Sequence, residues 1–233
     1  MSYSFYEVYI TAQRAFTAMG FPYGADEDAA YVIAWLELNN FDGFVLLSKL
    51  INHLDGKFDG KIKIDNLNKS IDLHNKSILM KGSGLVDFVN SKMKNKNKIS
   101  LKIVNCENGI FFLPLLYKSS ERLNLYQLIF CDKNDEINTF NIVNNKIIYN
   151  QKRNNNVLQK NTVIIIIDNN KKKFKDPIKS KTISEKQIQF NLSQSLSPAS
   201  DAWDIITKIA NKTFVPETDE SRKKGAGGGD DND

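Results

Sequence analysis

Histidine and cysteine are scarce in this chain, and their scarcity limits which residues can act as a catalytic base or form a disulfide bond. The only histidines in 233 residues are His53 and His74, so hydrolysis by a nucleophile and histidine pair has few candidate bases. Both cysteines, Cys106 and Cys131, lie in apolar, strand-like runs, where a free thiol behaves as a small buried hydrophobe. A chain with so little cysteine folds without disulfide bonds, which predicts a reducing, cytoplasmic location.

Arginine is also scarce, which argues against a nucleic-acid partner. The net charge of +5 and the isoelectric point near 9.0 come from lysine, because arginine occupies only four positions. The lysines are scattered among asparagines rather than interleaved with aromatic residues. Proteins that bind bases and phosphates favour arginine for its bidentate guanidinium, together with stacking aromatic rings. The sequence therefore predicts no nucleic-acid partner.

Long apolar runs are missing as well. No uninterrupted apolar run approaches the roughly 18 residues that a membrane span requires, and the first residues alternate between polar and apolar instead of forming a signal peptide. We therefore expect a soluble protein with no membrane partner. The hydrophobic fraction of 41% is enough for a sizeable core. Without an internal flexible linker, residues 1–212 are predicted to form one domain, followed by a Gly-rich acidic segment at 213–233.

The first 56 residues show helical periodicity. Ser4 and Glu7 have the spacing of a capping box, which predicts an amphipathic helix over residues 5–19. A second helix is expected from about 26 to 39, because acidic residues occupy its first turn. A third is expected from about 43 to 54. Short turns with Gly and Asn join the three, so this part is predicted to be a three-helix unit.

Residues 57–212 carry alternating and β-branched runs, which are typical of strands. A helix at about 85–94 separates two of these strands and indicates a parallel crossover, whereas closely spaced strands over 125–149 indicate hairpins, one turning at Asn144-Asn145. We expect an α+β fold, with the helical unit followed by a mixed, largely antiparallel sheet and flanking helices. An α/β arrangement stays open. The last helix, apolar at helical spacing, is predicted to dock on the sheet.

Two local patterns have both a structural and a chemical interpretation. Gly82-Ser83-Gly84 lies between a predicted strand and a predicted helix, which favours a tight turn over an anion-binding helix start. It lacks the third glycine of a dinucleotide fingerprint and the lysine of a P-loop, so no cofactor is assigned. His53 fits the end of the third helix, and His74 has no recognisable ligand spacing, so no metal site is predicted.

The two ends of the chain resemble one family. At the front, "SFYEVYITAQRAFTAMGFPYGADEDAAYVIAWLELNNFDGF" resembles its pattern of a short helix, an aromatic-glycine turn, an acidic-alanine helix with a central tryptophan and a glycine-led helix. At the back, "TFVPETDESRKKGAGGGDDND" resembles its pattern of aromatic-x-Pro, Ser-Arg, Gly-Ala-Gly and Asp-Asn-Asp. The family is bacterial, is called domain of unknown function 3726, and has no established activity. The resemblance implies that Phe214 and Pro216 are positioned for a purpose, together with a set of candidate ligand- or partner-binding residues: Ser221, Arg222, Gly225, Gly227, Asp231, Asn232 and Asp233.

The order of elements also resembles the sulfolactate, malate and lactate dehydrogenases that do not use a Rossmann fold. The opening helices and the run "SILMKGSGLVDFVNSKM" followed by "ISLKIVNCENGIFF" carry this similarity. Where that family has Ser-His-Gly after its second helix, this chain has Asp42-Gly43-Phe44. Where the family has a second histidine, this chain has Asn108 followed by Gly109. The resemblance therefore implies the scaffold without the imidazoles that hydride transfer uses as acid and base.

Two hypotheses for function follow. The first is an accessory or binding subunit whose C-terminal segment contacts a partner protein or a ligand. The second is a small-molecule enzyme whose site uses carboxylates and asparagines, since a pocket can shift a carboxyl pKa enough for catalysis. Its candidate members are Asp42, His74, Asn105, Glu107, Asn108, Arg222 and the terminal aspartates. A homodimer would be favoured by an exposed apolar patch at Phe111, Phe112 and Leu116.

Overall fold

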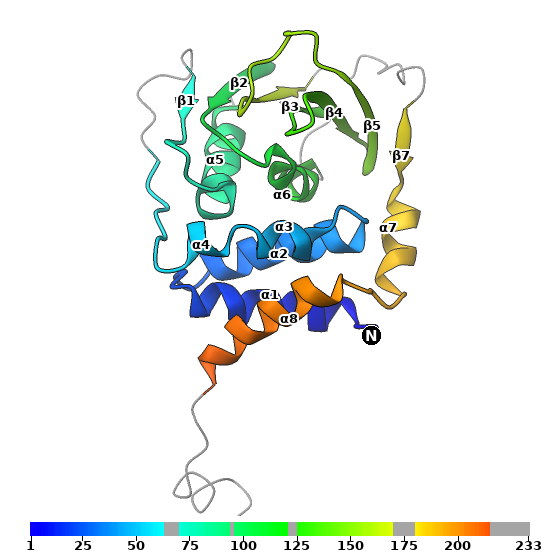
Figure 1. The fold of residues 1–233 in the computed structure, drawn as a ribbon. Helices are drawn as coiled ribbons and strands as arrows, with labels where there is room; N and C mark the ends of the chain where they lie inside the picture. Colours follow the sequence, from blue (N-terminus) through cyan, green and yellow to red (C-terminus); the bar gives the residue numbers. More distant parts are fainter. Residues whose placement is uncertain (63–69, 94–95, 121–124, 170–179, 215–233) are drawn as a thin grey trace, which may run out of the picture.

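The computed structural model describes residues 1–62, 70–93, 96–120, 125–169 and 180–214, and it places helical layers against one side of a sheet (Figure 1). The α-helices are α1 (Phe5–Ala18), α2 (Ala25–Leu38), α3 (Gly43–Ser48), α4 (Ile51–Leu54), α5 (Ile78–Met93), α6 (Phe112–Ser120), α7 (Glu185–Leu192) and α8 (Ser200–Ala210). The strands are β1 (Ile71–Asp72), β2 (Lys98–Val104), β3 (Leu125–Cys131), β4 (Glu136–Val143), β5 (Lys146–Arg153), β6 (Val163–Asp168) and β7 (Lys181–Ile183). Two 3₁₀ turns are η1 (Gly109–Phe111) and η2 (Asn211–Thr213).

The N-terminal helical unit has the predicted α1 and α2 and a modified third helix. The capping box is present, because the Ser4 hydroxyl accepts from the Glu7 amide at 3.2 Å and the Glu7 carboxylate accepts from the Ser4 amide at 2.7 Å. The predicted helix at 43–54 is divided into α3 and α4. The Leu50 amide donates to the Leu47 carbonyl, three residues back, at 2.9 Å. This tighter bond interrupts the α-helical ladder between the two helices.

The sheet is mixed and largely antiparallel, as predicted. Within the described ranges its seven strands run in the order β1-β2-β6-β3-β4-β5-β7, and β1 and β2 form a parallel pair joined through α5. The strands β3, β4 and β5 are consecutive antiparallel neighbours. Asn144 and Asn145 form the turn between β4 and β5 with φ of 49° and 57°, the left-handed values that a two-residue hairpin turn requires. The α+β prediction is therefore confirmed.

The helix α5 corrects the predicted glycine turn. It begins at Ile78 rather than near residue 85, so Gly82-Ser83-Gly84 lies within the helix, and its amides are not the start of a helix. The preceding apolar run at 78–80 is buried. A short apolar run fits a buried helix as well as a buried strand, so periodicity alone does not distinguish the two.

Two further expectations, one about the packing of the last helix and one about an exposed apolar patch, differ from the structure. The last helix, α8, packs on α1 and α3 rather than on the sheet. The Trp203 ring of α8 stacks on Tyr3 with centroids 3.7 Å apart and on Phe44 at 5.2 Å. The predicted apolar patch is not exposed, because α6 and η1 bury its side chains between the sheet and α2: Phe111, Phe112 and Leu116.

No helix among the described residues is both long and apolar enough to cross a bilayer.

Candidate functional site

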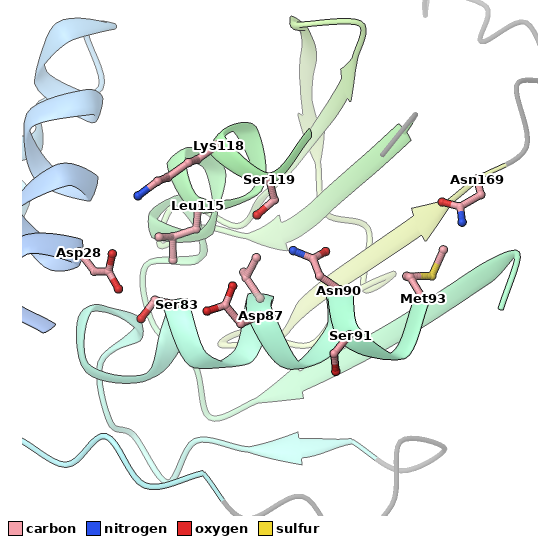
Figure 2. Close-up of a pocket in the computed structure, with 11 residues that line it drawn as sticks. Asp28, Ser83, Asp87, Asn90, Ser91, Met93, Leu115, Lys118, Ser119 and Asn169 are labelled. Atoms are coloured by element: carbon pink, nitrogen blue, oxygen red, sulfur yellow. The ribbon is translucent and has the colours of Figure 1, made fainter. Parts of the chain in front are cut away.

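A cavity of about 520 Å³ opens between α5 and α6 (Figure 2). The first turn of α2 and Asn169, which follows β6, complete its wall. Val86, Met93 and Leu115 supply apolar surface. The side chains that carry charges, hydroxyls or amides include Asp28, Ser83, Asp87, Asn90, Lys118 and Ser119. A volume of roughly 300–1,000 Å³ lined by apolar surface and a few convergent polar groups is typical of small-molecule sites.

A glycine in α5 sets the distance between the two helices. At Gly82, a Cβ would lie 2.9 Å from Leu115 Cδ1 and 2.6 Å from Ile78 Cγ2, so α5 and α6 meet closely there. Further along α5, the cavity separates the helices. Ser83, Asp87 and Asn90 follow one another at spacings of four and three residues, which places them on one face of a helix. Figure 2 shows these three side chains along the α5 wall of the cavity.

A buried tyrosine ties the cavity walls to the sheet. Tyr126, on β3, is 0% exposed. Its hydroxyl lies 2.8 Å from Asn90 Oδ1 on α5 and 3.3 Å from the Ser119 carbonyl on α6. Because Asn90 Oδ1 accepts from this hydroxyl, the Asn90 amide nitrogen is the group that faces the cavity toward Leu115 and Ser119 (Figure 2).

The charges around the cavity, among the residues that the structure describes, are two carboxylates and one ammonium. Asp28 lies in the first turn of α2, where the helix dipole favours a negative charge. Asp87 lies on the exposed side of α5. The Lys118 ammonium of α6 lies 5.0 Å from the centroid of the Tyr31 ring, a cation–π contact. Within the described part of the chain, neither Asp28 nor Asp87 forms an ion pair within 4.0 Å.

The described residues that line the cavity include no imidazole and no thiol. Burial, with a smaller effect of the Glu107 charge, raises the pKa of the Cys106 thiol to about 12. Burial and then the hydrogen bond with Asp135 raise the pKa of Cys131 as well. Neither thiol is thus activated as a nucleophile at neutral pH. The polar groups of the described lining that are available to a ligand are two carboxylates, one ammonium, hydroxyls and amides.

The predicted site residues Asp42 and Asn108 do not line the cavity. Both adopt the left-handed conformation, with φ of 50° before α3 and 56° before η1. At Gly43, a Cβ would lie 2.2 Å from the Ile33 carbonyl oxygen of α2. The position that resembles the dehydrogenase histidine motif is therefore a close contact between helices with no room for a side chain.

Three of the polar residues considered in the sequence meet at the ends of β1 and β2. Asp72 Oδ1 accepts from the His74 amide at 2.7 Å and from Asn105 Nδ2 at 2.9 Å. These bonds, the first being the stronger influence, lower the pKa of Asp72. The His74 side chain is 81% exposed, and its Nδ1 lies 3.7 Å from Asp72 Oδ2. The cluster is a surface turn, and among the described residues no group of three His, Cys, Asp or Glu is arranged to hold a metal ion.

The predicted C-terminal site lies outside the described residues, which end at Phe214. This applies to Pro216 and to every candidate ligand- or partner-binding residue of the tail: Ser221, Arg222, Gly225, Gly227, Asp231, Asn232 and Asp233. The Phe214 ring is 53% exposed, and the Arg14 guanidinium lies 4.8 Å from its centroid. A partner, homodimer or ligand contact by this segment stays a prediction.

Sequence reasoning missed the cavity residues for a local reason. The pattern around Asp28 indicates a helix start, and the glycines around Ser83 indicate a turn. In a helix that begins at Ile78, the spacing of Ser83, Asp87 and Asn90 indicates one polar helix face. No sequence signal indicated that this face lies opposite Lys118 and Ser119 of α6.

Comparisons with known proteins agree with this fold. The malate dehydrogenase from Entamoeba histolytica superposes with a TM-score of 0.65 at 7% identity, over 93% of this chain and 99% of that chain. A dehydrogenase from Sinorhizobium meliloti gives 0.64 at 8% identity, over 90% and 99%. The sulfolactate dehydrogenase from Methanocaldococcus jannaschii gives 0.61 at 9% identity, over 91% and 97%.

A search among curated proteins finds no match. The family model that matches is described as "Protein of unknown function (DUF3726)" and covers residues 3–98, which excludes the C-terminal pattern. That range includes α1 to α5 and the whole α5 wall of the cavity. Over residues 3–98 the chain thus resembles the family of proteins of unknown function 3726, and the whole has the fold of the malate and sulfolactate dehydrogenases.

Proposed function

We propose that this protein binds a small polar molecule in the cavity between α5 and α6, on a dehydrogenase-like scaffold with changed active-site residues. The observation that carries the proposal is the cavity itself, about 520 Å³ with charged, hydroxyl and amide groups converging from three helices. The lining joins the apolar side chains of Val86, Met93 and Leu115 to these polar groups, the combination that small-molecule sites use to hold and orient a ligand.

The proposal separates this protein from the hydride-transfer chemistry that the names of its structural neighbours suggest. The described part of the cavity lining has no histidine, and Gly43 leaves no space for one at the position that resembles the dehydrogenase motif. The acid–base groups in the described lining are the carboxylates of Asp28 and Asp87, which differ from an imidazole in charge. We therefore expect no change in reduced-nicotinamide absorbance when malate or lactate is supplied with a nicotinamide cofactor.

A ligand screen by thermal shift tests the proposal. The full-length protein would be heated with millimolar cationic, neutral and anionic metabolites and with nicotinamide cofactors. A ligand that binds the folded state raises the melting temperature as its concentration exceeds its Kd. We expect at least one small polar class to raise it, and Ser119→Trp, which places an indole in the cavity, to abolish that rise.

The matched control is Ser195→Trp, which adds the same side chain at an exposed position between α7 and α8. It should bind as the wild type does. The proposal is overturned if no compound produces a shift, or if every shift persists in Ser119→Trp.

A further inference from the structure

We infer that the ligand of this cavity is a small organic cation that also carries hydroxyl groups, of the amino-alcohol class. This inference rests on the proposed function and adds the sign of the ligand's charge. It follows from the balance of charges on the lining and from the direction in which each charge points.

The carboxylates outnumber the ammonium in the described lining. Asp28 and Asp87 both line the cavity, and neither is neutralised by an ion pair among the described residues. Figure 2 shows their carboxylates at the same end of the cavity, on either side of Ser83. An ammonium group placed there would be attracted by both carboxylates, and a charge-assisted hydrogen bond to either one is about twice as strong as a neutral one.

The cation of the described lining, Lys118, is already engaged. Its side chain is exposed, and its ammonium is 5.0 Å from the centre of the Tyr31 ring. In Figure 2 its nitrogen points to the side of α2, away from Asn90. An anionic ligand would therefore meet two carboxylates of its own sign and one ammonium, which points to the side of α2, the helix that carries Asp28. Like charges disfavour binding more strongly where water is partly excluded.

The remaining polar groups suit hydroxyls. Ser83 and Ser119 can each donate and accept, and the Asn90 amide nitrogen donates. Val86 and Leu115 offer an apolar surface for a short carbon chain. A 2-hydroxy acid would bring a carboxylate into a described lining with two carboxylates and one ammonium, so the cavity selects against the substrate class that the names of the structural neighbours suggest.

Three compounds of similar length and different charge test the inference: aminobutanol, butanediol and hydroxybutyrate. Titration calorimetry would be done on the full-length wild type at low salt. We expect aminobutanol to bind most tightly and hydroxybutyrate most weakly. Asp87→Asn and Asp28→Asn should each raise the Kd of aminobutanol roughly tenfold, the loss of affinity expected for one charged hydrogen bond. Lys118→Met should leave its affinity equal or improve it.

Asp204→Asn is the matched control, because it makes the same charge change at an exposed position of α8. It should leave aminobutanol binding unchanged, which separates a local effect from that of net charge. The inference is wrong, while the proposed function stands, if butanediol or hydroxybutyrate binds more tightly than aminobutanol and Ser119→Trp abolishes that binding. It also fails if aminobutanol binds and neither Asp28→Asn nor Asp87→Asn changes its affinity. If none of the three binds, the amino-alcohol inference fails, and the broader screen decides the proposed function.

Discussion

Two glycine contacts between helices, at Gly43 and at Gly82, have opposite consequences for the molecule. At Gly43 the start of α3 lies against the backbone of α2, and a Cβ there would be only 2.2 Å from the Ile33 carbonyl oxygen. At Gly82 the facing atoms belong to side chains, and the helices then separate around a cavity. The first contact closes the place that resembles a dehydrogenase motif, and the second lies beside the candidate site. The atoms that face a glycine therefore decide whether it closes a space or borders one.

The largest effect is expected from Gly43→Ala. The new methyl group would overlap a backbone oxygen, which cannot rotate away, so α3 must shift from α2. We expect the free energy of unfolding to fall by about 3 kcal/mol. Urea denaturation measures it. Gly84→Ala is the control, because its Cβ would lie 3.3 Å from Ile62 Cδ1, and alanine is favoured in a helix by about 0.5–1 kcal/mol. A loss below about 0.5 kcal/mol at Gly43 would contradict the close contact.

A smaller loss is expected from Gly82→Ala. Overlap with Ile78 Cγ2 and Leu115 Cδ1 costs energy, but these methyl groups can move, and alanine favours the helix. The net destabilisation should be about 1 kcal/mol by urea denaturation. In a Leu115→Ala background the cost should decrease, because the facing methyl is gone. Equal costs in both backgrounds would show that α6 does not limit the space at this position.

Tyr126→Phe should weaken the attachment of the cavity walls to the sheet. It removes the hydroxyl that bonds Asn90 and reaches the Ser119 carbonyl, at a cost of about 1 kcal/mol in unfolding free energy. Amide hydrogen exchange should increase at the C-terminal ends of α5 and α6. Tyr3→Phe, which removes a hydroxyl whose bond to Met1 is exposed, should change neither measurement. Unchanged exchange in Tyr126→Phe would show that this bond does not hold the walls.

The smallest effect concerns pH at the Gly43 contact. The Glu37 carboxylate accepts from the Phe44 amide at 2.9 Å, while burial, which outweighs this bond, raises its pKa above the usual 4.5. A raised folded-state pKa contributes stability that is complete below pH 4.5 and is lost as the pH rises through the raised value. Glu37→Gln should avoid this loss and exceed the wild type by less than about 1 kcal/mol near neutral pH. Stability curves of the two proteins that stay parallel from about pH 4 to about pH 8 would refute this.

Much of the fold was predictable because its signals are local. The capping box at Ser4 and Glu7 involves residues three apart, and the Asn144-Asn145 turn involves adjacent ones. The alternation that predicts strands is similarly short-range. Packing partners were not predictable in this way. The apolar face of α8 is evident from residue spacing, but whether Trp203 meets the sheet or meets Tyr3 and Phe44 depends on distant parts of the chain.

At the candidate site, too, the sequence indicates the types of residue that are present but not how they are arranged in space. The scarcity of histidine and cysteine left few candidate bases and nucleophiles, and the structure places both cysteines in buried positions and both histidines in exposed ones. The carboxylates Asp28 and Asp87 belong to different helices, α2 and α5, that are far apart in the sequence. No local rule brings two such residues to one cavity, because the chain between them can close in many ways.

Local chain chemistry was enough to define the helical and extended segments, since capping, periodicity and turn preference act between near neighbours. The cavity arises from packing, because Gly82 sets how closely α5 and α6 approach and Tyr126 fixes their distance from the sheet. Packing at Gly43 likewise leaves no room for a side chain between α3 and α2. Sequence spacing carries no information about such contacts, which form only when three helices and a strand meet in one core.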